Sequence, residues 1–451
     1  MSIILGLLGL SLVVVVHEFG HFLAARAVGV DVEAFSIGWG PRLAGFVSRG
    51  TEWRLSAFPL GGYCRMKGEH SFKRALDEGL THIPSEPGSF YGASPARRMA
   101  ILVAGPAANV LLAIFLFSFV SLIGIPLQTA PNRIVLASEV ASAPSQPNPA
   151  DLSGLKTGDW ILEADGRPVR DYADLQEAVG TRPNQPIRLL VKREEATFTI
   201  DITPRLDTAS GQGFIGVYAW IDPIIEKVES GQAGALAGFK AGDRILAVNG
   251  KTVEKTTDLI SALGTKPERA DFIILREGKE QELKPVLSYG ETGQSDLGIE
   301  FKRVERRDRT SSLGAALLSG FSETWKTFRL SIQGVGLLFK GVDIFKALSG
   351  PARITYLVGS TAQDSIRASG FSGLGTILSF LAFLSVGLGF MNLLPVPALD
   401  GGQILLSVAE AAKRSPLKAR TIYRYQFVGA AMIAAIFLVA TLGDLFFFAG
   451  K

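Results

Sequence analysis

Apolar and polar positions divide this chain into long apolar stretches and longer mixed segments. The apolar stretches cover about residues 2–25, 99–124, 371–395 and 425–448. A helix needs about 20 apolar residues to cross a bilayer, so each stretch predicts a transmembrane helix. Four crossings place both ends of the chain on the same side of the membrane.

The mixed segment between the second and third stretches contains one pattern twice, in residues 154–166 and 238–250. In each copy a Gly-Asp turn precedes a short apolar strand, an Asp-Gly or Asn-Gly turn and an amphipathic helix, expected at 171–179 and 257–263. The copies are 84 positions apart (Gly154 to Gly238), which suits independent domains better than a solenoid. The pattern resembles bacterial PDZ domains, and an unrelated pair of β-rich domains is the alternative.

Apolar residues recur near helical spacing between 311 and 340, with basic residues among them, which predicts an amphipathic helix in the membrane interface. The predicted domains are the first half of a membrane core (1–126), two PDZ domains (127–221 and 222–309) and the second half of the core (310–451). The expected fold class is a polytopic α-helical membrane protein with two inserted mixed α/β domains.

Composition agrees with this mixture, since 47% of the 451 residues are hydrophobic and the mean hydropathy is +0.27. The net charge is only +4 and the basic residues are dispersed, so nucleic-acid binding has no electrostatic footprint. Cys64 is the only cysteine. A disulfide within the chain and a zinc site built from several thiolates are therefore excluded.

Charge also predicts the orientation of the chain. Lys and Arg crowd the first loop (26–98) and the last loop (413–424), which places both loops in the cytoplasm. The long connection that carries the repeats then faces the outside. No basic residue precedes the first apolar run, and Arg26 follows it, so we expect a retained helix rather than a signal peptide.

The segment His17-Glu18-Phe19-Gly20-His21 lies at the inner end of the first apolar stretch. Two histidines four residues apart share one face of a helix, where both imidazoles bind one metal ion while Glu18 reaches a water on its open position. Ionisable groups in a bilayer segment are costly and mark function. A polar seam between helices is the alternative.

A catalytic zinc usually has three protein ligands. The strongest candidate for the third is Asp400, which follows Asn392-Leu393-Leu394-Pro395-Val396-Pro397-Ala398-Leu399 at the end of the third apolar stretch. Two prolines break the helix there, and non-helical backbone at membrane depth is tolerated where it is buried or lines a cavity. A simple helix end and turn is the alternative.

Together these features resemble the site-2 protease family of intramembrane zinc proteases, in its bacterial RseP type. The resemblance rests on HExxH in the first helix, NxxPxPxLDG in the third and the two PDZ-like modules between the second and third. Gly105-Pro106-Ala107-Ala108-Asn109 resembles the family's GPxxN, and Pro59-Leu60-Gly61-Gly62-Tyr63 resembles its PLGGY. One departure is Gln403, where relatives often carry His. It follows the motif and should not alter metal binding.

The resemblance implies one Zn²⁺ per chain, bound by His17, His21 and Asp400, with Glu18 as the catalytic base. It implies that Asn392 holds substrate or stabilises the oxyanion and that Asn109 lines the same cavity. It also implies a membrane-reentrant β-loop that offers a strand edge to unwound substrate. The residues of this β-loop are Trp53, Arg54, Leu55, Ser56, Ala57 and Phe58, and an ordinary cytoplasmic hairpin is the alternative.

By the same resemblance, the partners are the lipid bilayer and single-pass membrane proteins already trimmed outside the cell, such as an anti-sigma factor of a stress response, and remnant signal peptides. The PDZ domains would bind peptides or C-termini and act as a size filter. The location would be the bacterial inner membrane, with both termini and the PDZ domains in the periplasm and the active site near the cytoplasmic face.

Two other functions compete with this interpretation. A membrane scaffold could hold partners on its PDZ domains, but a structural metal site does not need the base Glu18. A metal transporter needs polar groups along a path across the membrane, whereas here they cluster at one face.

Overall fold

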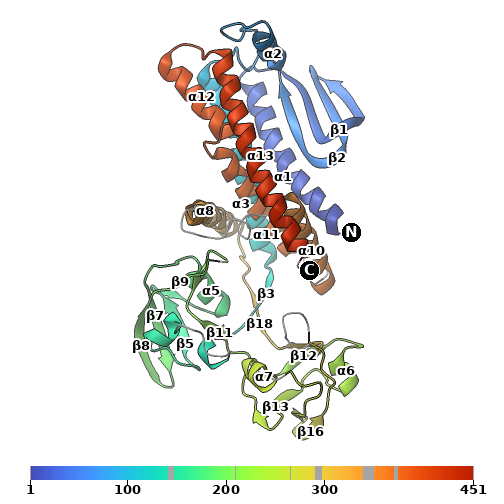
Figure 1. Ribbon diagram of the computed structural model, residues 1–451, viewed down its shortest axis with the longest axis vertical. Helices are drawn as coiled ribbons and strands as arrows, with labels where there is room; N and C mark the ends of the chain where they lie inside the picture. Colours follow the sequence, from blue (N-terminus) through green and yellow to red (C-terminus); the bar gives the residue numbers. More distant parts are fainter. Residues whose placement is uncertain are drawn as a thin grey trace. The chain divides into compact units, whose positions relative to one another are not determined.

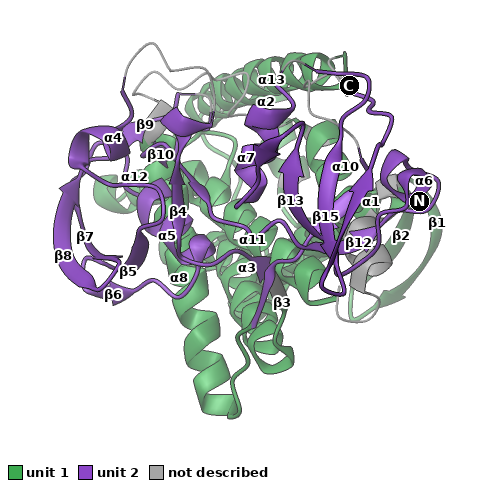
Figure 2. Cartoon of the chain, turned by 90° about the horizontal axis from the view of Figure 1, so that it is seen from below, with its two compact units in different colours: residues 1–125, 307–451 green, residues 126–306 purple. Residues whose placement is uncertain are grey.

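The computed structural model describes residues 2–140, 147–208, 210–264, 266–289, 297–338, 350–369 and 374–449. The chain forms two compact units, one of residues 1–125 with 307–451 and one of residues 126–306 (Figure 1 and Figure 2). We call them the membrane unit and the β-rich unit. The second is therefore an insertion between two halves of the first.

Four helices of the membrane unit are long and apolar enough to cross a bilayer: α1 (Ser2–Ala27), α3 (Pro95–Ile123), α11 (Leu374–Leu393) and α13 (Ala419–Ala449). The prediction of four helices long and apolar enough to span a membrane is confirmed. α3 begins earlier than predicted because Ser94 caps it through the Arg97 N–H and Pro95 occupies the first turn. Residues 371–373, the predicted start of the third stretch, lie outside the described residues.

The membrane unit also contains α2 (Glu69–Asp77), α8 (Leu313–Leu338), α10 (Pro351–Ser369) and α12 (Asp400–Lys413). α8 occupies most of the predicted amphipathic segment, of which residues 339 and 340 lie outside the described part. It packs on α3 and α11 and exposes Leu317, Phe321 and Trp325. α10 and α12 are helices that the sequence pattern did not predict.

An apolar core joins α1, α3 and α11. Val13, Ala113, Ala382 and Val386 are fully buried there. Asp444 of α13 is also buried, and its carboxylate accepts hydrogen bonds from the N–H groups of Gly350, Ala352 and Arg353 at the start of α10. Asp444 therefore caps the start of α10 from another helix of the membrane unit.

A long antiparallel hairpin of β1 (Val32–Ser48) and β2 (Thr51–Met66) lies beside α1. Its register shifts at several points, which is typical of a strongly bent hairpin. The predicted strand 52–58 falls within β2, so its strand conformation is confirmed. Several large apolar side chains on the hairpin are exposed, namely Trp39, Leu43, Phe46, Leu55 and Phe58.

The β-rich unit contains two four-stranded sheets with the same strand order. The first joins β6 (Arg167–Pro168), β5 (Trp160–Ala164), β7 (Ile187–Arg193) and β8 (Ala196–Ile202), and the second joins β14 (Lys251–Thr252), β13 (Arg244–Val248), β15 (Phe272–Arg276) and β16 (Lys279–Leu283). The helices α5 (Tyr172–Gly180) and α7 (Thr256–Ala262) occupy equivalent places, within one residue of the predicted ranges. Each half has its own apolar core. The sequence repeat therefore corresponds to a repeated β-rich domain, while its assignment as PDZ stays a prediction.

Shorter elements complete the β-rich unit. In the first half they are β4 (Ile134–Leu136), η1 (Ala137–Glu139), α4 (Pro149–Ser153), β9 (Arg205–Leu206), β10 (Gly213–Phe214) and β11 (Val217–Ala219). In the second half they are β12 (Ile225–Val228), α6 (Ala233–Ala237) and β17 (Ile299–Phe301). β4 pairs with β11, β9 with β10, and β12 with β17.

The repeated Gly-Asp turns share an ion pair that sequence inspection did not predict. Asp159 pairs with Arg193, and Asp243 pairs with Arg276, at 2.7 Å and 2.6 Å. Each arginine also donates to the carbonyl of the first glycine of its motif, Gly154 or Gly238 in turn. Both aspartates are about 1% exposed, so the motif aspartate in each copy is a buried and satisfied structural group.

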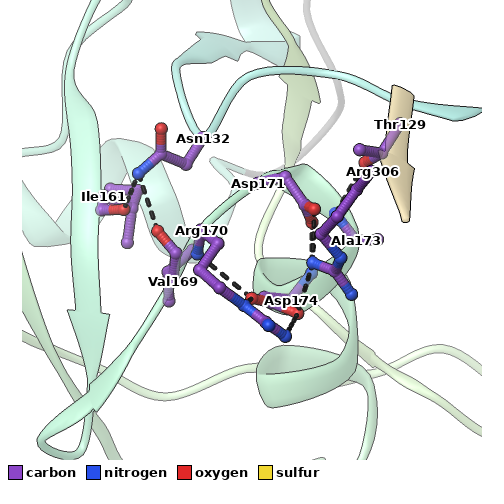
Figure 3. Close-up of polar contacts among 9 residues, drawn as sticks. All are labelled: Thr129, Asn132, Ile161, Val169, Arg170, Asp171, Ala173, Asp174 and Arg306. Atoms are coloured by element: carbon purple, nitrogen blue, oxygen red, sulfur yellow. Dashed lines mark hydrogen bonds and ion pairs between the residues drawn. The ribbon is translucent and has the colours of Figure 1, made fainter. Parts of the chain in front are cut away.

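The segments that lead into and out of the β-rich unit pair with each other as β3 (Pro126–Thr129) and β18 (Val304–Arg307). Arg306 of β18 forms ion pairs with Asp171 and Asp174 at the start of α5 (Figure 3). Asp171 is also the N-cap of that helix, accepting from the Asp174 N–H. The connection is thereby attached to the first β-rich domain.

Candidate metal centre

His17 and His21 lie on one face of α1, as their spacing predicts, and both are buried. Each imidazole has a partner at its Nδ1. His21 Nδ1 lies 2.8 Å from the carbonyl oxygen of Ile101 on α3, to which it donates. Since a neutral imidazole carries one proton, this bond leaves His21 Nε2 as a lone-pair donor.

Asp400, the first residue of α12, brings its carboxylate to the two imidazoles. Its Oδ2 lies 3.1 Å from His17 Nε2 and 3.4 Å from His21 Nε2, and the two Nε2 atoms are 3.2 Å apart. The cluster thus joins residues separated by almost the whole chain. Among the described residues, these three form the one group of His, Cys, Asp or Glu side chains whose ligand atoms converge within 4.8 Å.

The cluster fits a divalent metal of the zinc type. Two imidazole nitrogens and one carboxylate oxygen are a common catalytic zinc ligand set, which leaves a fourth position open. Asp400 Oδ2 is buried and has no hydrogen-bond donor, and an anionic oxygen at such a place needs a cation. Gly105 of α3 leaves room for the imidazoles, because a Cβ there would lie 2.3 Å from His21 Nε2 and 2.9 Å from His17 Cε1.

Asn109 lies beside His17 and is fully buried, one turn of α3 after Gly105. Its Nδ2 is 3.2 Å from His17 Nδ1, and its Oδ1 is buried without a partner. A rotation of this amide by half a turn places Oδ1 against a protonated Nδ1. In that arrangement Asn109 Oδ1 has a hydrogen-bond partner and His17 Nε2 is free to bind a metal ion. Histidines that bind metal usually donate their other ring N–H to such a neighbouring group.

Glu18 contacts the hairpin. Its Oε2 accepts a hydrogen bond of 3.0 Å from the backbone N–H of Cys64 on β2. The Pro59–Tyr63 segment permits this approach, because Gly61 has a positive φ of 93° and a Cβ there would lie 2.9 Å from Val14 of α1. A backbone N–H of the hairpin therefore fixes one carboxylate oxygen of the candidate base, Glu18.

The predicted β-loop residues differ in their contacts and in their exposure to solvent. Trp53 packs edge-on against Phe22 and at a tilt against Phe35, and the Ser56 hydroxyl shares a hydrogen bond of 2.9 Å with Ser36. Arg54 pairs with Glu52, Ala57 is half-buried, and Leu55 and Phe58 are exposed.

Asn392 lies in the last turn of α11 and is half-buried. The described contacts assign its side chain no partner in the metal cluster, so its predicted role stays a prediction. The other two histidines, His70 and His82, are exposed and do not belong to the cluster.

Comparison with known proteins agrees with this geometry. The family described as peptidase family M50 matches residues 5–436. The chain belongs to peptidase family M50, the site-2 proteases.

Relatives of this peptidase match it over nearly their whole length. A Treponema pallidum protein named "Putative zinc metalloprotease" is 39% identical over 448 residues, which is 99% of each chain. The "Regulator of sigma-E protease RseP" of Escherichia coli is 30% identical over 456 residues, covering 97% of each. A protein of the same name from Salmonella typhimurium is 28% identical with the same coverage.

This membership establishes a zinc metalloprotease of the site-2 type, and it confirms the family resemblance and the zinc cofactor that the motifs predicted. A role in regulated intramembrane proteolysis follows from it. Sequence inspection singled out the GPxxN and PLGGY motifs and gave Asn109 a role in substrate or oxyanion binding, which stays a prediction. It gave no task to Gly105 or Gly61. Their close approach to α1, and the contact of Asn109 with His17, are seen only in the three-dimensional arrangement.

Proposed function

We propose that this site-2 protease is an endopeptidase that cuts the transmembrane segments of single-pass membrane proteins. The observation that carries the proposal is the convergence of His17, His21 and Asp400 within a unit of helices that are long and apolar enough to cross a bilayer. A buried site among such helices meets peptide bonds of other membrane segments rather than those of soluble chains.

In this proposal His17, His21 and Asp400 bind the zinc. A zinc held there would supply a Lewis acid for the scissile carbonyl and for the attacking water. Glu18 would take a proton from the attacking water and deliver it to the leaving amine. The Cys64 N–H orients Glu18 for this task by fixing Oε2, which leaves Oε1 to carry the proton. Asn109 positions His17, and Asn392 binds substrate or stabilises the oxyanion.

The hairpin would receive the substrate before cleavage. A transmembrane helix hides its peptide bonds in its own hydrogen bonds, so it must unwind locally before attack. The predicted edge at residues 53–58 is not free, because Trp53, Arg54 and Leu55 are already paired on both sides, with residues 35–37 and with residues 44–46. The 62–66 segment of β2, whose Cys64 contacts Glu18, is paired on one side only in the described sheet, and an unwound chain would add there. The exposed apolar side chains of the hairpin suit a loop that dips into the membrane.

The β-rich unit would act as a size filter for substrates of the membrane unit. Each of its domains has a groove between a helix and a neighbouring strand, of about 320 Å³ in the first and about 270 Å³ in the second. Leu175 and Val179 of α5 line the first with residues 213–218, while Leu259 of α7 and its C-cap Leu263 line the second with residues 297–301. Extended peptides or C-termini fit grooves of this kind.

The substrates would be anti-sigma factors already cut outside the membrane, in a stress response, and remnant signal peptides. The relatives named for sigma-E regulation support the first class. The location would be a bacterial inner membrane, with the termini and the β-rich unit in the periplasm and the metal centre near the cytoplasmic face. The basic first and last loops support this orientation.

The test uses a tagged single-pass substrate expressed with wild type, Glu18→Gln, and the exposed control Glu78→Gln. We expect Glu18→Gln to reduce cleavage by at least about 10²-fold, since general-base catalysis contributes that much, and to retain zinc. Glu78→Gln should cleave like wild type. Cleavage by Glu18→Gln at the wild-type rate would show that Glu18 is not the catalytic base.

The filter is tested separately by deleting residues 126–306 and joining the flanks with a short flexible linker. Full-length substrate, uncut outside the membrane, should then be cleaved, while wild type should cut only the trimmed form. An intact full-length substrate beside normal cleavage of the trimmed form would exclude the filter.

A further inference from the structure

A cavity lies in the membrane unit, and none of the three metal-cluster residues lines it. Its volume is about 680 Å³, and we call it the α3–α12 cavity. Its walls are the segment before α3 with the first turns of that helix, the end of α12, and Ile422 of α13. Along α3, its residue Arg98 precedes Gly105 by seven positions, or about 10 Å at 1.5 Å per residue. The cavity is therefore a separate site.

A buried ion pair forms one wall of the cavity. Arg98 of α3 and Glu410 of α12 are each less than 10% exposed and are joined through Arg98 Nη2 and Glu410 Oε2. The other oxygen of Glu410 accepts a hydrogen bond of 2.8 Å from the Leu417 N–H. Glu410 is thus satisfied by protein groups, whereas Arg98 Nε is buried and has no acceptor.

Positive groups exceed negative ones around this cavity. Arg414, the C-cap of α12, adds a second guanidinium to the lining. The start of α3 adds the positive end of the helix dipole and the backbone N–H of Ala96, since Ser94, Pro95 and Ala96 all line the cavity. Pro95 has no N–H, and the N–H groups of Arg97 and Arg98 donate to Ser94. The hydroxyl-bearing residues Ser85 and Ser415 lie there as well. Guanidinium, helix N-terminus and hydroxyl groups together are typical of a phosphate site.

The remaining walls are apolar, and the cavity is much larger than a phosphate ion. Met99, Ala411, Leu417 and Ile422 contribute these walls. The cavity also lies where two membrane-crossing helices begin, α3 at Pro95 and α13 at Ala419. Lipid headgroups meet a membrane protein at such helix ends, and basic pockets between helices bind anionic headgroups there.

We propose that the α3–α12 cavity binds one anionic phospholipid, with its phosphate at Arg98, Arg414 and the first turn of α3 and its glycerol and upper acyl region on the apolar wall. A lipid held there joins the start of α3 to the end of α12. Those two helices carry Asn109 and Asp400, so the lipid supports the alignment of the metal centre from outside it.

The experiment measures lipid retention by the full-length protein in detergent, using native mass spectrometry with phosphatidylglycerol and, for comparison, phosphatidylcholine. Wild type should retain one phosphatidylglycerol in preference to phosphatidylcholine. Arg414→Gln should weaken that binding about tenfold, because a charge-assisted hydrogen bond is lost. Ala411→Trp, which fills the cavity, should abolish it.

Arg420→Gln is the matched control, because Arg420 is exposed in the first turn of α13 and does not line the cavity. It should bind lipid like wild type. Equal binding by wild type, Arg414→Gln and Ala411→Trp, all with normal zinc content, would overturn the proposal. Displacement of the lipid by millimolar inorganic phosphate would assign the site to soluble phosphate and overturn the lipid assignment.

Discussion

Buried aspartates occur in both units of this chain, but their surroundings differ. Asp243 of the β-rich unit is fully buried, pairs with Arg276 and accepts the Lys240 N–H. Asp400 of the membrane unit faces two imidazoles, and its Oδ2 has no hydrogen-bond donor. The protein itself supplies hydrogen-bond and charge partners for the Asp243 carboxylate. The Asp400 carboxylate needs a cation as its partner.

This difference separates structural from chemical uses of the same residue type. A buried charge with a full set of partners stabilises one arrangement of the chain. A buried charge that lacks partners costs stability unless a ligand supplies them. Removing Asp243 should therefore damage folding and spare metal binding, while removing Asp400 should do the reverse.

The largest effect is expected for Asp400→Asn. Loss of one of three ligands should remove most of the bound zinc and reduce cleavage of a single-pass substrate by about 10³-fold. Thermal unfolding of the zinc-free protein should stay close to that of zinc-free wild type. Zinc content is measured by atomic absorption on protein purified without chelator, and wild-type zinc content in the variant would remove Asp400 from the ligand set.

Asp243→Asn should instead destabilise the second β-rich domain by about 2 kcal/mol, because the buried Asp243 carboxylate loses its charge-assisted hydrogen bonds with the half-buried Arg276. Hydrogen exchange of β13 and β15 should report the loss. Zinc content should not change. The double variant Asp243→Leu with Arg276→Met should recover part of the stability, and a double variant as unstable as the single one would show that the charge pair itself is not the cause.

Gly105→Ala is expected to lower zinc affinity about tenfold, because the added methyl group must displace the imidazole of His21. Gly387→Ala on α11 is the matched control, since its methyl group would meet no atom within 4 Å. Chelator competition measures both affinities. Equal values for the two variants would contradict the close packing of α3 on the histidines.

The smallest effect concerns Cys64. Burial, followed by the negative charge of Glu18, raises the pKa of its thiol to about 12. The thiolate is the reactive form, so alkylation of zinc-free protein at pH 8 should be slow. Glu18→Gln removes the negative charge, lowers the pKa of the thiol and should speed alkylation about two- to fivefold. An unchanged alkylation rate would show that the charge of Glu18 does not affect the pKa of the Cys64 thiol.

Local sequence patterns predicted the elements that depend on local physics. The four apolar stretches became membrane helices because length and hydropathy alone decide that outcome. The repeated Gly-Asp and Asx-Gly turns predicted two equivalent domains, and Asp165 and Asn249 both adopt the positive φ that such turns require. α10 was not predicted, because polar residues interrupt its apolar positions and its start depends on a cap from distant Asp444.

For the metal centre, spacing was enough to place His17 and His21 on one face of α1, since helix geometry is local. Motif chemistry also identified Asp400 and Glu18. Three other contacts join residues more than 40 positions apart. They are Arg98 with Glu410, Glu18 with Cys64 on β2, and Asn109 with His17. No periodicity in a single sequence encodes such contacts.

The amino-acid order of this chain determines its membrane helices, its duplicated domains and the residue types of a zinc peptidase, because hydropathy, turn preference and ligand chemistry are properties of short segments. Tertiary structure decides which carboxylate is left for a metal and which is neutralised by arginine. That choice depends on distances between segments far apart in the chain, and only packing sets those distances.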